Sequence, residues 1–157
     1  MARDAKRMDG LLPSLFWRID EAEQSVDPIS VSLSQYKADV LRNLRWILNS
    51  SCRPEYDAIN DFEEAKDSLL NYGIPATTGK FAQSVDIEVF IERIKKALMR
   101  FEPRIIRGSL EVEAISSTES GVEIGFAVRG EIWCEPLPER FNVETFIDSD
   151  SGEWSFK

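Results

Sequence analysis

The chain has 157 residues and a formal net charge of −9 at pH 7, a size that fits one domain with a core that needs no disulfide or metal. It contains no histidine, which excludes histidine-based catalytic triads and histidine metal sites. From residue 105 onward eleven acidic residues face four basic ones, which argues against binding to nucleic acid or to an anionic membrane.

The two cysteines and the absence of a long apolar segment indicate where the protein works. Cys52 and Cys134 are far apart and form no C-x-x-C pair, so we expect free thiols in a reducing compartment, with a disulfide as the alternative. No stretch has the length or composition of a secretory signal or a transmembrane helix. We therefore expect a soluble cytosolic protein that does not insert into a membrane.

The first part of the chain predicts a flexible lead followed by a short helix. Residues 1–10 form the lead. One side of the helix collects apolar residues, with Pro13 acceptable in its first turn, so we expect that side to dock on the body of the protein. These residues are Leu11, Leu12, Leu15, Phe16 and Ile19. Asp27-Pro28 then indicates a loop.

A second helix is predicted to start at Ser32, because Ser32 and Gln35 have the spacing of a capping box. Its apolar stripe contains Leu33, Tyr36, Val40, Leu44, Ile47 and Leu48. Arg42, Arg45 and Trp46 lie off this stripe. They are either a solvated flank with one half-exposed ring or a surface for a partner.

A connector and a third helical segment follow. Asp61 and Glu64 have the spacing of another capping box, which predicts a short helix through Leu69 and Leu70. Gly73 can end this helix in the left-handed conformation, and Pro75 prevents its continuation.

The stretch from Ser84 to Arg104 predicts the strongest amphipathic helix of the chain. Its apolar residues recur at three- and four-residue steps, and its other face is charged. Pro103 ends the helix near Phe101 or Glu102, so that Glu102 and Arg104 flank a rigid corner. That corner is either a helix stop with a local ion pair or a place where Arg104 extends towards a partner.

Beyond Arg104 the pattern alternates with a period of two, which predicts three to four half-buried strands. Two of them flank the Ser120-Gly121 turn, a third contains Phe141, Val143 and Ile147, and a fourth runs from Glu153 to Phe156. We expect an α+β domain over residues 1–157, mainly helical from 11 to 101 and an antiparallel meander from 104 to 157. The helices should pack on this meander.

No catalytic, cofactor-binding or metal-binding motif occurs, so we expect no catalytic residue, no cofactor and no metal. Pairs of carboxylates remain, and these are the equipment of glycoside hydrolases. Among 28 acidic residues such a pair arises easily by chance, and none is distinguished by the sequence.

Four stretches, read together, resemble the TssE family of type VI secretion baseplate subunits. Residues 13–20 resemble its PSLF-x-R-L-x-D opening with Trp17 in place of an acid, and residues 41–49 resemble its RDLEWLLN helix with Asn43 and Arg45 in place of acids. Residues 71–75 match its NYG-[LI]-P turn, and residues 101–104 match FEPR. The matches follow the order of the family.

The resemblance implies a non-enzymatic baseplate component that links the wedge to the contractile sheath and helps initiate sheath assembly, in the cytoplasm at a baseplate docked on the inner membrane. It implies TssF-, TssG- and TssK-like wedge subunits and TssB- and TssC-like sheath subunits as partners. Alternatives are a phage or other contractile-tail wedge protein, a regulatory anti-adaptor on the same fold, and a lysozyme-like glycoside hydrolase. The changes at Asn43 and Arg45 leave the contacts of that helix open.

The resemblance also assigns the candidate binding residues. Glu102, Pro103 and Arg104 become a docking motif for the wedge, next to the possible partner surface of Arg42 and Trp46. We then expect Arg104→Ala to leave the fold intact and to weaken assembly.

A second binding site is expected at the C-terminal strand. Trp154 and Phe156 should anchor it to the core, while the backbone groups of Ser155 remain available to a sheath segment at the edge of the sheet. On this reading, Ser155→Pro impairs sheath initiation more than folding.

Overall fold

The computed structural model describes residues 11–21, 31–54, 57–76, 86–115 and 123–157. The helical part contains α1 (Leu15–Glu21), α2 (Leu33–Leu48), η1 (Ala58–Asp61), α3 (Glu63–Lys66), η2 (Leu69–Asn71), α4 (Ile87–Phe101) and η4 (Arg107–Ser109). The strands are β1 (Glu111–Ile115), β2 (Glu123–Ile132), β3 (Glu139–Asp148) and β4 (Trp154–Phe156). This arrangement confirms the predicted α+β fold. The predicted lead at 1–10, the Asp27-Pro28 loop and the Ser120-Gly121 turn lie outside the described residues.

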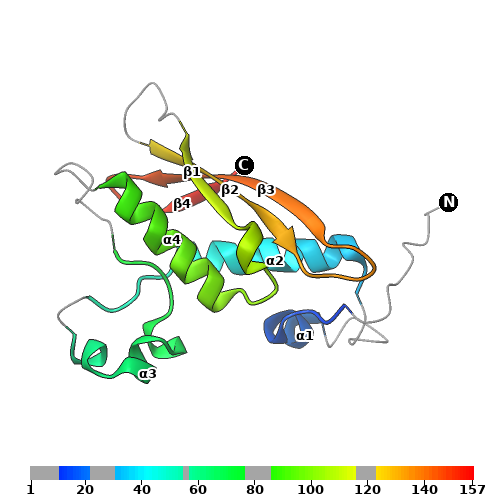
Figure 1. Cartoon of the computed structure of the whole chain (residues 1–157), viewed down its shortest axis with the longest axis horizontal. Coiled ribbons are helices and arrows are strands. Elements are labelled where there is room, and N and C mark those ends of the chain that lie inside the picture. Colours follow the sequence, from blue (N-terminus) through cyan, green and yellow to red (C-terminus); the bar gives the residue numbers. More distant parts are fainter. Residues whose placement is uncertain (1–10, 22–30, 55–56, 77–85, 116–122) are drawn as a thin grey trace.

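The strands form a meander in which every pair of neighbours is antiparallel, in the order β1-β2-β3-β4. Figure 1 shows α2 and α4 side by side on one face of this sheet, and the core lies between them and the sheet. One face of each strand points to the helices because side chains alternate. The fully buried side chains include Phe126, Val128, Ile132, Ile147, Val40, Ile47, Ile94 and Leu98.

Helix α2 begins as predicted. The side chain of Ser32 accepts a hydrogen bond from the Gln35 amide, and the Gln35 side chain accepts one from the Ser32 amide, so both halves of the capping box are present. Its buried stripe also contains a charged residue, Asp39.

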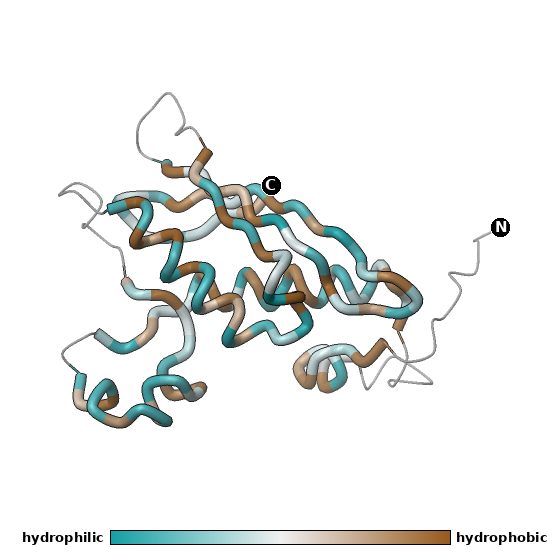
Figure 2. Tube along the Cα trace, viewed as in Figure 1, coloured by the Kyte–Doolittle hydropathy of each residue, from teal (hydrophilic) through white to brown (hydrophobic). Residues whose placement is uncertain are grey.

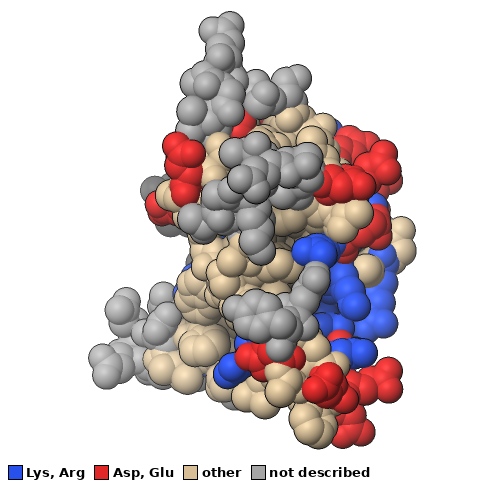
Figure 3. Space-filling view, turned by 90° about the vertical axis from the view of Figure 1, so that its left-hand side faces the viewer, with Lys and Arg blue, Asp and Glu red and all other residues tan. Residues whose placement is uncertain are grey.

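Helix α4 starts at the cap residue Asp86 and buries its apolar stripe as predicted, except for the first residue, Ile87, which is exposed. Its other face carries the exposed Arg93 and Lys96. Figure 3 shows Lys and Arg gathered in one patch, with Asp and Glu above and below it. The basic side chains on this side of an acidic protein are therefore grouped, with acidic side chains on either side of them.

The connector between α2 and α4 differs from the prediction. Helix α3 starts after Phe62, which makes no side-chain cap, and the expected capping box at Asp61 and Glu64 is absent. Instead, Asp57 caps η1 through the Ile59 amide, and Ser68 caps η2. The short segment breaks into three turns, since none of its residues is buried deeply enough to hold one longer helix.

Two further observations concern the cysteines and the apolar character of the helices. Neither Cys52 nor Cys134 forms a disulfide, which confirms the expected thiols. Within the described segments, no helix has both the length and the apolar character needed to cross a bilayer.

Gly73 joins this connector to α2 in a way that only glycine permits. It has φ = +105°, as the predicted left-handed turn requires, and Ile74 forms a parallel bridge with Ser51. A Cβ atom on Gly73 would lie 2.1 Å from the Ser50 carbonyl oxygen. The turn thus needs glycine for both its backbone conformation and its close approach to α2.

We predict that Gly73→Ala lowers the free energy of unfolding by about 2 kcal/mol or more, because it combines backbone strain with a clash against main-chain atoms. Urea denaturation measures this loss. Gly108→Ala is the control, since a Cβ there meets no atom within 4 Å. Equal stability of the two variants would show that the turn relaxes freely.

Candidate partner-binding sites

The corner after α4 is built on an internal ion cluster. Glu102, only 1% exposed, accepts bonds from Arg104 at both oxygens, with 2.7 Å from Nε to Oε1 and 2.7 Å from Nη2 to Oε2. The remaining nitrogen of the guanidinium, Nη1, lies 2.7 Å from Oδ2 of Asp39. The Tyr36 ring lies 5.2 Å from the guanidinium carbon. Arg104 therefore bridges two buried carboxylates, whereas Pro103 is exposed.

This geometry corrects the expectation that Arg104 extends towards a partner. Its side chain is 15% exposed, and Nε, Nη1 and Nη2 all bond to internal carboxylates. The alternative expectation, a helix stop with a local ion pair, is closer to the structure. The ion pair between Glu102 and Arg104 is buried, however, and Arg104 also pairs with Asp39. Arg104 holds the shape of the corner, and Pro103 is the part of the motif that a partner can touch.

Asp39 connects this corner to the start of the chain. It accepts bonds at 2.8 Å from both the amide and the hydroxyl of Ser14, and at 2.7 Å from Arg42. Burial favours the neutral acid and is the largest single influence on the pKa of Asp39, but the bonds from Arg104 and Ser14 together hold that pKa below its ordinary value. The carboxylate thus ties α1, α2 and the corner together.

Asp39 is not among the site residues expected from the sequence, although its position carries a signal. It lies three residues after Tyr36 and one before Val40, on the buried stripe of α2. A charged residue at such a position indicates a buried ionic partner, because an unpaired charge there is costly. The sequence does not say which basic residue that partner is.

The two departures from the family pattern also have contacts. Asn43 Nδ2 donates to Glu102 Oε2 at 3.1 Å, a bond that an ionised acid at this position could not make. The guanidinium of Arg45 lies 5.1 Å from the ring centre of Phe156. Both side chains therefore serve packing within this chain.

Helix α1 exposes the side that was expected to dock. Leu12, Leu15, Phe16 and Ile19 are 59–61% exposed, and only Leu11 of the predicted set is buried. The attachment uses the other side, through Ser14 and through Trp17, which packs against the core. Figure 2 shows hydrophobic residues in this helix although it lies at the periphery.

The exposed apolar residues continue onto α2. Phe16 meets Trp46 edge-to-face with ring centres 5.2 Å apart, and Arg42 lies 5.2 Å from the Trp46 ring centre. Trp46 is 39% exposed. We name the surface of Leu12, Leu15, Phe16, Ile19, Arg42 and Trp46 the α1–α2 face. Such a contiguous apolar surface is typical of an interaction site.

At the other candidate site, β4 is an edge strand, and among the described residues it pairs with β3 alone. Trp154 is buried and Phe156 packs against the core, as expected. The expectation for Ser155 was wrong. The backbone amide of Asp148 donates to the Glu153 carbonyl, and the backbone amide of Lys157 donates to the Glu144 carbonyl. Hydrogen-bonded pairs recur at every second residue along an antiparallel ladder. Ser155 lies midway between Glu153 and Lys157, so its backbone amide and carbonyl bond to β3 as well.

The backbone amides and carbonyls that point away from β3, toward the outer edge of the sheet, are consequently those of Trp154 and Phe156. Ser155→Pro would break the internal ladder between β3 and β4, so it does not separate folding from docking.

The buried carboxylates give no support to a hydrolase. Asp39 and Glu102 share Arg104, and the pKa of Asp39 is lowered, whereas a general acid needs a raised one. Among the described residues, no group of three or more Cys, Asp or Glu side chains could hold a metal ion.

We predict that Arg104→Ala lowers the free energy of unfolding by about 3 kcal/mol or more, because it removes the cation that two buried carboxylates share and leaves Glu102 without an ion-pair partner. Thermal or urea denaturation measures the loss. Arg129→Ala removes an exposed ion pair with Glu113 and should cost less than about 1 kcal/mol. If both variants lose the same small amount, the cluster does not stabilise the fold.

Comparison with known proteins agrees with this structure. Searches of curated proteins and of solved structures gave no significant match. The family described as baseplate wedge protein gp25 matches residues 34–137, a range that contains α2 except its first residue, the corner, β1 and β2. That family includes TssE, so the resemblance seen in the sequence is confirmed. The chain belongs to the gp25 family of baseplate wedge proteins of contractile tails.

Proposed function

We propose that the protein is a TssE-like subunit of a type VI secretion baseplate that joins the wedge to the contractile sheath and helps to start sheath assembly. The family membership carries the baseplate role. The PSLF-like opening at residues 13–20 lies outside the matched range and favours the secretion system over a phage tail. In this role the protein works in the cytoplasm, at a baseplate docked on the inner membrane.

The wedge contact is assigned to the α1–α2 face together with Pro103. Baseplate wedge proteins associate with other baseplate components, so the occupant we propose is a neighbouring wedge subunit of the TssF, TssG or TssK type. Four exposed apolar side chains and the Trp46 ring offer it an apolar centre, and Arg42 supplies a charged rim. Glu102 and Arg104 act by holding the corner beside this face.

The sheath contact is assigned to the outer edge of β4, at the opposite end of the chain. An edge strand presents main-chain groups to which a TssB- or TssC-like segment can add. A subunit with one contact for the wedge and another for the sheath is suited to couple the two.

The experiment for this proposal is co-purification with the wedge and sheath subunits encoded by neighbouring genes. Recovery of both would support the linking role. Neighbouring genes for phage tail fibres and capsid, with no secretion subunits, would assign the protein to a phage-type tail instead.

A matched pair of variants tests the wedge face. Leu15→Ser should weaken wedge binding about tenfold, since it replaces an exposed apolar anchor with a polar group. Leu70→Ser, at a residue of similar exposure on η2, should bind as the wild type does. Binding is measured by pull-down and by titration of the purified wedge subunits. Equal affinities of the two variants would remove the α1–α2 face from the interface.

A structural role also predicts that purified protein does not cleave peptidoglycan. Release of soluble fragments from cell walls is the measurement. Activity that disappears when a single acidic residue is exchanged would overturn the non-enzymatic assignment.

A further inference from the structure

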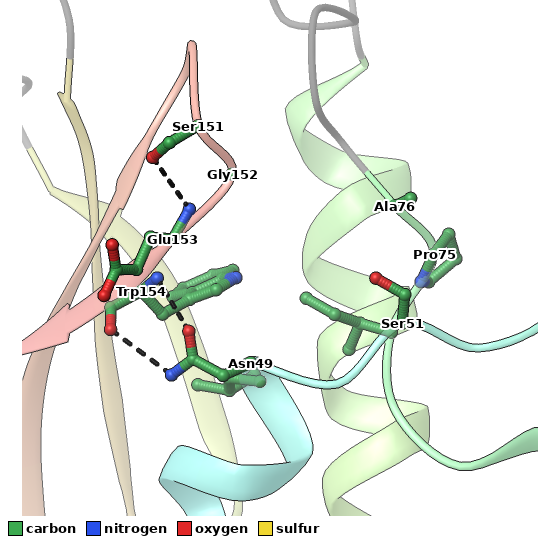
Figure 4. A pocket seen from close by; sticks show the side chains of 10 residues that line it. Asn49, Ser51, Pro75, Ala76, Ser151, Gly152, Glu153 and Trp154 are labelled. Atoms are coloured by element: carbon green, nitrogen blue, oxygen red, sulfur yellow. Dashed lines mark hydrogen bonds between the residues drawn. The ribbon is translucent and has the colours of Figure 1, made fainter.

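The outer edge of β4 is occupied in part by a side chain. Asn49, the C-terminal cap residue of α2, accepts a bond from the Trp154 amide at 3.0 Å and donates one to the Trp154 carbonyl at 3.3 Å. Figure 4 shows both bonds. Its Nδ2 atom also donates to the Arg45 carbonyl at 3.1 Å, which holds the carboxamide on the helix end. A carboxamide thus offers Trp154 the donor and acceptor that a neighbouring strand would offer.

The next outward position is different. Phe156 pairs with Thr145 at a non-hydrogen-bonded site of the ladder, so its amide and carbonyl point away from β3. Within the described part of the chain, no hydrogen bond satisfies these two groups. The edge is therefore closed at Trp154 and open at Phe156.

A groove of about 260 Å³ lies beside the closed position. Figure 4 shows Glu153 and Trp154 on one side, Ser51 and Pro75 on the other, and Asn49 at the base between them. The side of the groove that contains Ser51 and Pro75 is held in place by backbone hydrogen bonding. The Cys52 amide donates to the Ile74 carbonyl at 2.9 Å, next to the Ser51–Ile74 bridge. Of the described residues that line the groove, Glu153 alone is charged, and Figure 4 shows its carboxylate directed away from Ser51 and Pro75.

We propose that Asn49 is a displaceable cap on this edge, and that an extended peptide segment carrying a basic side chain takes its place. The segment pairs first with the open groups of Phe156. It then replaces the Asn49 carboxamide at Trp154 and places its basic side chain beside the Glu153 carboxylate, on the face of the strand that is turned away from the groove. This inference rests on the proposed sheath contact and names the chemistry of its occupant.

The exchange has a physical advantage. Each bond that Asn49 gives up is replaced by a bond to the incoming main chain, so no buried polar group is left unpaired. Until a partner arrives, the cap shortens the exposed edge, which limits unwanted pairing between copies of the protein. The hydrogen bond from Asn49 to the Arg45 carbonyl remains, so the C-terminal cap of α2 is preserved.

The test compares Asn49→Ala with Asn71→Ala. Asn71 also bridges two main-chain groups, the Arg53 amide and the Lys66 carbonyl, but these belong to the connector. In the isolated protein, Asn49→Ala should accelerate hydrogen exchange of the Trp154 amide, and Asn71→Ala should leave it unchanged. The probe for binding is the purified pair of sheath subunits from the same gene cluster.

With the cap removed, Asn49→Ala should bind the sheath pair about 5- to 100-fold more tightly, the range for two hydrogen bonds that no longer need to be displaced. Asn71→Ala should bind as the wild type does. Glu153→Gln should weaken binding and make it less sensitive to salt. Unchanged or weaker binding by Asn49→Ala would overturn the cap.

A measurement on the wild-type protein keeps the proposal testable if Asn49→Ala does not fold. In the sheath complex the side-chain amide resonances of Asn49 should shift while the Trp154 amide stays protected from exchange. If sheath binds and these resonances do not change, the cap is wrong and the linking function stands. If neither wild type nor variant binds sheath, the proposed function itself fails.

Discussion

The fold depends on the two carboxylates that share Arg104. Asp39 and Glu102 are 2% and 1% exposed, and the guanidinium between them is the one cation that both buried carboxylates bind. Through Ser14, the same cluster attaches α1, which otherwise has few buried apolar contacts. An ionic centre therefore positions an element that hydrophobic burial alone would leave loosely held.

Helix α2 connects both proposed contacts. Asp39, near the middle of α2, attaches the α1–α2 face, and Asn49 at the C-terminal end of α2 caps the β4 edge. These positions are ten residues apart, which corresponds to about 15 Å of helix. Force between the wedge and the sheath would thus pass through the C-terminal half of one regular element, which a side-chain bridge holds at each of these two positions.

The periodic parts of the structure were predictable because each is decided locally. The capping box at Ser32, the stripe of α4 and the alternating strands follow from hydrogen bonding and side-chain direction within a few residues. The connector was predicted less well. Its capping box at Asp61 competes with the turn that Asp57 caps, and no buried residue favours the longer helix.

The sequence by itself determined the α+β order, the family and the places of the candidate sites. Only the tertiary structure decided what each residue does there. Arg104 turns inward and bonds to Asp39. Asp39 lies 65 residues earlier in the chain, so no local pattern reveals that pairing. The tertiary structure left the apolar side of α1 exposed, and it directed the bonds of Ser155 to β3 and those of Trp154 to Asn49, since burial and register depend on which elements meet.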